Sequence, residues 1–141
     1  MTLDILICTL EKRREVFEGI LGLLEAQQEE VPDVAILWES DVGQMSVGTK
    51  RQKLLERAAA DYIVFVDDDD HVSLDYLHRI TQALKETPDC VGMQGLITID
   101  GDTPALFEHS LKHDHWFSEG GVHYRCPNHL NPVRRELALQ A

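Results

Sequence analysis

The stretch that decides the fold runs Tyr62-Ile63-Val64-Phe65-Val66-Asp67-Asp68-Asp69-Asp70. Its first five residues are β-branched or aromatic, which predicts a strand buried on both faces, as central parallel strands are. Four carboxylates follow directly, and a divalent cation would relieve their mutual repulsion, because hard oxygen ligands suit Mg²⁺ or Mn²⁺. Ligands of open α/β sheets bind just beyond the carboxyl ends of the strands, where these aspartates fall. The alternative is a solvated acidic start to the next helix, where negative charge favours the helix dipole.

Strands and helices alternate around this stretch. Strands are predicted at residues 3–10, 34–38, 62–66 and 90–99, and helices at residues 11–28, 49–60 and 74–86. This order predicts an α/β fold, with a mostly parallel, Rossmann-like sheet flanked by helices. After residue 103 the pattern loosens into short strands or loops near 116–117, 122–126 and 132–133, followed by helix formers from Arg134 to Ala141. The C-terminal part is therefore expected to be small or incomplete.

Size, charge and cysteine content limit the classes of function. A chain of 141 residues is expected to form a single domain with its own core. The net charge of −12 opposes non-specific binding to nucleic acid or anionic lipid. Three widely spaced cysteines (Cys8, Cys90 and Cys126) predict a reducing compartment. No apolar run is long enough for a membrane span, and Asp4 interrupts the first apolar stretch, so we expect a cytoplasmic protein without a signal peptide.

Several residues before the aspartates follow a recognisable order. Arg51-Gln52 opens a predicted helix, Ala58-Ala59-Ala60 forms a patch of small residues, and the strand then leads to Asp67, Asp69 and Asp70. This order resembles the nucleotide-sugar half of family 2 glycosyltransferases of the GT-A fold, with Gln52 where that family carries Asn. The resemblance implies one GT-A-like domain over residues 1–141. Residues 1–100 would form its nucleotide-sugar-binding half and residues 101–141 a partial acceptor-side region.

The resemblance also implies an activity and a donor site. The activity is an inverting, metal-dependent transfer of sugar from a nucleoside-diphosphate donor, with UDP-sugar favoured, to a hydroxyl acceptor. Thr9 and Glu39 end the first two strands at positions similar to those that hold base and ribose, although the family more often has Asp at the second. Arg51 suits a base edge or a phosphate, because its planar fork offers several donors. The alternative for Arg51 is a surface pair with Asp61 or Glu56.

Each aspartate has its own expected part. Asp69 is the first choice as direct metal ligand (Mn²⁺ or Mg²⁺), and Asp67 is the second, either directly or through water or ribose. Asp68 is grouped with the nucleotide-binding residues, but strand alternation favours a structural or exposed side chain. Asp70 would cap the next helix or orient its neighbours. His129 is a candidate third metal ligand, because residues 127–135 resemble a segment that closes over the donor in some family members.

The general base is not identified by the sequence. The acidic candidates are Asp100, Asp102, Glu108, Asp114 and Glu119. Nothing in their spacing singles one out.

Three further features have open interpretations. His109, His113 and His115 suggest a zinc site or plain polar surface. Trp116 and Phe117 are expected in the core, with an exposed platform for an acceptor sugar as the alternative. Arg13 and Arg14 would either reach phosphate or remain solvated.

Two other functions compete with sugar transfer. A donor-binding module without complete catalytic machinery would explain the missing base. A haloacid-dehalogenase-type phosphatase also ends a strand in Asp-any-Asp, but His71 stands where that family prefers Thr or Val. Leu137 and Leu139 need cover near the C-terminus, which suggests pairing with a second copy.

Overall fold

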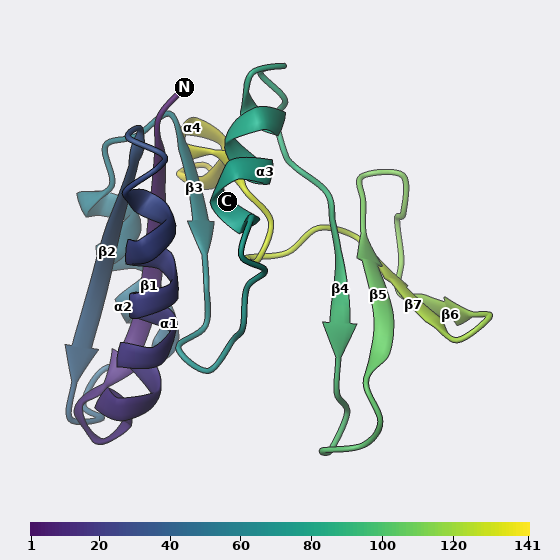
Figure 1. Ribbon diagram of the computed structural model, residues 1–141, viewed down its shortest axis with the longest axis horizontal. Coiled ribbons are helices and arrows are strands. Elements are labelled where there is room, and N and C mark those ends of the chain that lie inside the picture. The colour runs from purple at the N-terminus through teal and green to yellow at the C-terminus, as the bar shows by residue number, and fades with distance from the viewer.

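The computed structural model describes all 141 residues and contains two four-stranded sheets. The first sheet has the order β2-β1-β3-β8, and its strands span Leu3–Leu10 (β1), Val34–Asp41 (β2), Tyr62–Phe65 (β3) and Val133–Arg134 (β8). β1 pairs in parallel with both β2 and β3, whereas β8 runs antiparallel to β3. In Figure 1 the second sheet lies beside the first sheet and the helices that pack on it.

Helices cover both faces of the first sheet (Figure 1). One face carries α1 (Arg14–Gln28), which follows the 3-10 turn Glu11–Arg13, together with α3 (Tyr76–Leu84). The other face carries α2 (Val47–Arg57) and the short α4 (Arg135–Ala138). Side chains alternate along β1, so Leu3, Ile5 and Ile7 pack on the α1/α3 side and Leu6 packs on the α2 side. This double burial explains the apolar run of β3 and the mostly apolar sequence of β1, which only Asp4 and Thr9 interrupt.

The second sheet differs from the sequence prediction. Its strands are β4 (Met93–Ile97), β5 (Ala105–His109), β6 (Phe117–Glu119) and β7 (Val122–Arg125), in the order β4-β5-β7-β6. Only the β5–β7 pair is parallel. Residues 90–99 therefore add no parallel strand to the first sheet, and the fold has two mixed sheets instead of one mostly parallel sheet. The physical reason is exposure: no side chain of β4 is fully buried, whereas a central parallel strand needs cover on both faces.

Most predicted elements of the first hundred residues are present, with shifted ends. β2 continues three residues past the predicted Trp38, and α2 begins earlier because the Ser46 hydroxyl accepts a hydrogen bond from the Thr49 N–H (3.1 Å). α4 has only four residues, and Leu137 and Leu139 remain exposed. No helix is both long enough and apolar enough to cross a bilayer.

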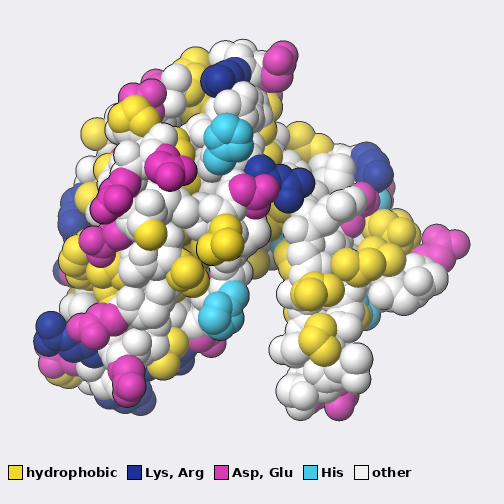
Figure 2. All heavy atoms as spheres, in the orientation of Figure 1, with side chains coloured by type: hydrophobic (Ala, Val, Ile, Leu, Met, Phe, Trp, Pro, Cys, Tyr) yellow, Lys and Arg dark blue, Asp and Glu magenta, His cyan; other side chains and the backbone are white.

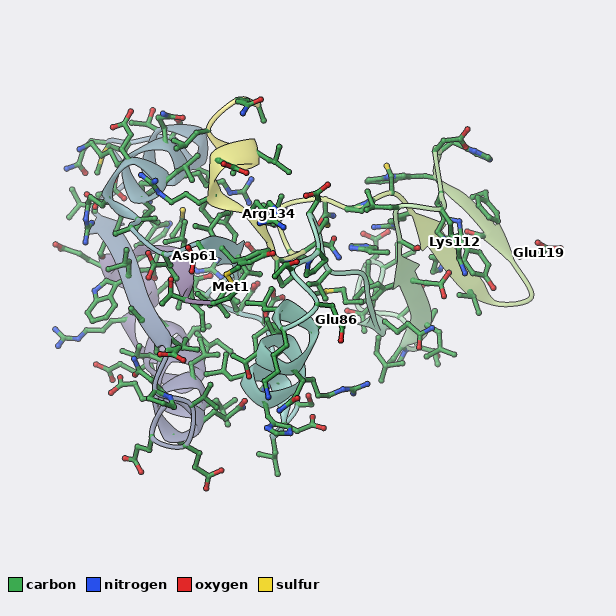
Figure 3. The ribbon with its side chains drawn as sticks, turned by 90° about the horizontal axis from the view of Figure 1, so that it is seen from above. Met1, Asp61, Glu86, Lys112, Glu119 and Arg134 are labelled. Atoms are coloured by element: carbon green, nitrogen blue, oxygen red, sulfur yellow. The ribbon has the colours of Figure 1, made fainter.

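Trp116 does not join the core. Its side chain is 61% exposed, and the Arg125 guanidinium lies 4.4 Å from its ring centroid. Phe117 is half-buried and stacks on Tyr124, with 4.9 Å between ring centroids. These rings belong to the second sheet, whose labelled residues Lys112 and Glu119 lie far from Met1 and Asp61 in Figure 3. The expectation of a core position is therefore wrong for Trp116, because the second sheet has no helix layer of its own.

Candidate functional site

The four aspartates leave β3 in a loop at the carboxyl end of the parallel strands. α3 begins only at Tyr76, with Asp75 as its N-cap residue, so the aspartates do not cap this helix. The loop closes on itself, because the Asp70 N–H donates to the Asp67 carbonyl (3.1 Å) and the Asp67 N–H donates to Asp70 Oδ2 (3.2 Å). Asp70 thus orients its neighbours, which was one of the two roles expected for it.

Asp68 anchors the loop to β1. Its side chain is buried and accepts hydrogen bonds from the Thr9 hydroxyl (3.0 Å) and from Arg13 Nη2 (2.7 Å). Both bonds cross between elements, since Thr9 lies near the end of β1 and Arg13 precedes α1. Asp68 therefore has its charge satisfied within the protein, in keeping with the structural role that strand alternation favours.

Asp67 faces a different set of partners. Arg51 Nη2 lies 3.8 Å and His129 Nε2 lies 3.5 Å from Asp67 Oδ1. The neighbouring imidazole, followed by the two arginines 51 and 13, lowers the pKa of Asp67, although partial burial opposes this shift. The loop that carries His129 is fixed to the sheet, because the Phe65 N–H donates to the His129 carbonyl (3.1 Å). Arg51 also lies over the Phe65 ring (5.6 Å to the centroid), so it does not form the surface pairs considered as its alternative.

Asp69 and Asp70 line a large open cleft. The Asp69 carboxylate is mostly exposed and lies 3.3 Å from Arg13 Nη2. Burial raises the pKa of Asp70, and the nearby Asp67 charge adds to this effect. The cleft has a volume of about 1170 Å³ and separates α3 from the second sheet, as the notch between the two bodies in Figure 2 shows.

Asp67 and His129 fit a divalent cation better than the rest of the loop does. His129 Nε2 is buried without a hydrogen-bond partner, and its distance from Asp67 Oδ1 is too long for a good hydrogen bond. No three acidic, histidine or cysteine side chains converge on one point. This donor set suits Mg²⁺ or Mn²⁺ bound by one or two protein side chains, with substrate phosphates and water as the remaining ligands.

A second, smaller cavity lies where β1 ends and α2 begins. It has a volume of about 350 Å³, and its lining includes Thr9, Arg13, Lys50 and Asp68. Glu39 does not reach it: Arg57 Nη1 donates to the Glu39 carboxylate (2.8 Å) on the α2 side of the sheet. The structure thus brings Thr9 and Asp68 together and pairs Arg51 and His129 with Asp67, but leaves Glu39 apart.

The acidic candidates for a general base are not equivalent. Among the five, only Glu108 lines the large cleft. Its carboxylate is bound to His113 Nε2 (2.7 Å), to Gln94 Nε2 (3.1 Å) and to Lys112 Nζ (3.3 Å), and these contacts lower the pKa of Glu108 to about 2. So low a pKa makes a weak base.

The three histidines form no zinc site. His113 pairs with Glu108, His115 Nδ1 lies 2.6 Å from Asp114, and His109 Nδ1 donates to the Asn131 side-chain oxygen (3.0 Å). Each imidazole therefore has its own partner.

Sequence reasoning missed the buried pair of Lys50 and Asp41. Lys50 Nζ donates to Asp41 Oδ1 (2.6 Å) and to the Thr9 carbonyl (2.9 Å), and both side chains are almost completely buried. A signal was present, because Lys50 lies four residues before Leu54 and eight before Ala58, on the apolar face of α2. A charged residue on that face indicates a buried partner.

One family model matches this chain. The family described as "Glycosyl transferase family 2" matches residues 25–138, from within α1 to the last residue of α4, which is more than half of the chain. No curated protein matches the chain well enough to count as a relative.

Proposed function

This chain belongs to glycosyl transferase family 2, and we propose that it moves a sugar from a nucleoside-diphosphate donor to a hydroxyl acceptor with inversion at the sugar carbon. The favoured donor is a UDP-sugar, bound with Mn²⁺ or Mg²⁺. One observation carries the proposal. At the carboxyl end of β3, Asp67 faces the buried, unpartnered Nε2 of His129.

The donor would lie across the ends of β1 and β3. Thr9 and Asp68 border the small cavity and would shape the place of the base and ribose. Arg51, beside Asp67, would donate to the diphosphate through its planar fork. Asp67 and His129 would hold the cation, with Asp69 on its exposed side. When bound there, a divalent cation supplies positive charge against the departing diphosphate.

The large cleft is the proposed place of the acceptor. It separates the aspartate loop from the second sheet, so residues 101–141 contribute its far wall through Phe107 and Glu108. β4 (Met93–Ile97) also lines this wall, so the proposed boundary between a nucleotide-binding half (residues 1–100) and an acceptor-side region (residues 101–141) falls within the second sheet. Inversion in one displacement needs only a base at the acceptor hydroxyl and charge stabilisation at the leaving group.

The test compares Asp67→Asn with the matched control Asp33→Asn, an exposed aspartate without a side-chain hydrogen bond. UDP binding is measured by calorimetry with and without Mn²⁺, and UDP release from UDP-sugars is measured in parallel. Loss of a metal's outer-shell partner typically costs about 10–100-fold in affinity, so loss of a ligand should weaken Mn²⁺-dependent UDP binding at least this much. Wild-type affinity in the Asp67→Asn variant would overturn the proposal.

A second candidate, a nucleotide-sugar-binding module without transfer, is favoured by the state of Glu108. The one acidic candidate in the cleft has its carboxylate occupied by three partners. Mn²⁺-dependent UDP binding without UDP release across a panel of hydroxyl acceptors would support the module. UDP release that depends on an added acceptor would support the transferase.

A further inference from the structure

The ammonium group of Lys50 is buried beside the small cavity with an unused hydrogen-bond donor. Lys50 is only 2% exposed, and its Nζ donates to Asp41 Oδ1 (2.6 Å) and to the Thr9 carbonyl (2.9 Å). An ammonium carries three N–H donors, so one of them has no acceptor within the protein. Buried donors are nearly always satisfied, and Lys50 lines the cavity. The missing acceptor therefore belongs to whatever occupies this cavity.

The charges around the cavity favour a neutral acceptor. Lys50 is paired with the equally buried Asp41, and Arg13 is paired with Asp68, so each cation at the cavity is already balanced by a carboxylate. A phosphate placed there would bring a negative charge that no unpaired cation of the lining balances. A carbonyl oxygen would accept the free N–H without adding charge. The volume, about 350 Å³, lies near the lower end for ligand sites and suits a one-ring base.

We propose that Lys50 reads a ring carbonyl of the donor's nucleobase, so that the site selects uracil, a single ring with two carbonyls, over adenine, a two-ring base whose neutral acceptors are ring nitrogens. This inference rests on the proposed function, since it assumes a nucleotide donor. It assigns recognition of the base to Lys50 in place of Glu39. Asp41 then acts as a positioning residue, because it holds the ammonium at the cavity wall. The Met45 N–H in turn donates to Asp41 Oδ2 (2.7 Å), which fixes the carboxylate from the loop side.

The test measures the affinities of UDP and ADP, each with Mn²⁺, for the wild type, Lys50→Gln and Lys53→Gln. Lys53 is the matched control, an exposed lysine on the same helix without a side-chain contact. A hydrogen bond to a charged donor contributes about 1.5–3 kcal/mol, so Lys50→Gln should weaken UDP binding roughly 10- to 100-fold and ADP binding less than about 3-fold. The ratio of the two affinities is the readout, because a general loosening of the fold would lower both.

Glutamine keeps two N–H donors, the number that Asp41 and the Thr9 carbonyl accept, and lacks the third donor of the lysine ammonium. If Lys50→Gln alone fails to fold by circular dichroism, the double variant Asp41→Asn/Lys50→Gln replaces the buried ion pair by two neutral amides and is read in the same way.

The outcomes separate this inference from the proposed function. Equal UDP and ADP affinities in the wild type, or an unchanged ratio in the Lys50 variants, would overturn the role of Lys50 while Mn²⁺-dependent nucleotide binding remained. A wild type that binds neither nucleotide would overturn both proposals. A UDP preference that disappears in Lys50→Gln and persists in Lys53→Gln supports the inference.

Discussion

Asn131 is the residue whose removal should do the most damage to both the fold and the site. Its side chain is almost completely buried at the junction between the two sheets. Nδ2 donates to the Val91 carbonyl, and Oδ1 accepts from the Asn128 N–H and from His109 Nδ1, all at 3.0 Å. One amide therefore connects β5, the segment leading into β4 and the loop that carries His129.

The cost of Asn131→Ala follows from the three groups left behind. Each loses its partner in a buried site, and each unsatisfied buried group costs about 1–3 kcal/mol. Water entering the space left by the amide would relieve part of this cost, so we expect a loss of about 3 kcal/mol in the free energy of unfolding. For a chain of this size such a loss lowers the melting temperature by about 10 °C. Because His129 loses its support, Mn²⁺-dependent UDP affinity should fall as well.

The assay is urea unfolding followed by circular dichroism. The control is Gln94→Ala, which removes an exposed hydrogen bond to Glu108 on β4 and should cost less than about 1 kcal/mol. An Asn131→Ala variant whose unfolding free energy matches that of Gln94→Ala within about 0.5 kcal/mol would refute the reasoning. It would show that the amide contacts do not hold the second sheet in place.

Three further predictions concern the second sheet and α1. The contacts with His113, then Gln94 and Lys112, lower the pKa of Glu108 from 4.5 to about 2, so this carboxylate stabilises the fold above pH 4.5 and loses that contribution as the pH falls towards 2. Glu108→Gln should therefore flatten this part of a stability–pH curve measured by urea unfolding. A Cβ added at Gly95 would lie 2.6 Å from the Phe107 ring, so Gly95→Ala should cost about 1–3 kcal/mol in the same assay. Gly22→Ala, inside α1 with nothing within 4 Å, should instead stabilise the protein by about 0.5–1 kcal/mol, and a loss of stability there would contradict the helix assignment.

The first sheet was predictable because the apolar residues of its strands and helices follow patterns that indicate which side chains are buried. β3 is a continuous apolar run, β1 is mostly apolar, and α1 carries its buried residues at helical spacing, so local patterns and tertiary environment agree. The second sheet was not predictable in this way. Residues 105–109 and 117–125 contain few fully buried side chains, and the parallel β5–β7 pair joins segments whose contact no local pattern reveals. Long-range pairing also brings β8 to the edge of β3.

The candidate site was predictable in its location but not in its contacts. The aspartates after β3 and Thr9 at the end of β1 meet because parallel strands end at one edge of the sheet. The partner of Glu39 depends on the face of β2 on which its side chain lies. In the structure that face is the one covered by α2, and Arg57 at the end of α2 donates to the Glu39 carboxylate. The strand predicted for residues 34–38 continues in the structure to Asp41, whose side chain is buried, and the apolar pattern gives no sign of this extension.

The four aspartates differ in charge compensation because their side chains contact different parts of the fold. Asp68 is saturated by a hydroxyl and a guanidinium from the β1 side, whereas Asp67 has only a distant arginine and an unpartnered imidazole nitrogen. The four carboxylates therefore face two guanidinium groups and one imidazole, which leaves negative charge at the edge of the cleft. Coulomb attraction for a cation is strongest where that charge is both uncompensated and partly shielded from water. Asp67 is partly shielded and its two cationic neighbours lie 3.5 and 3.8 Å away, whereas the more exposed Asp69 lies 3.3 Å from Arg13. We therefore expect metal affinity to depend more on Asp67 than on Asp69.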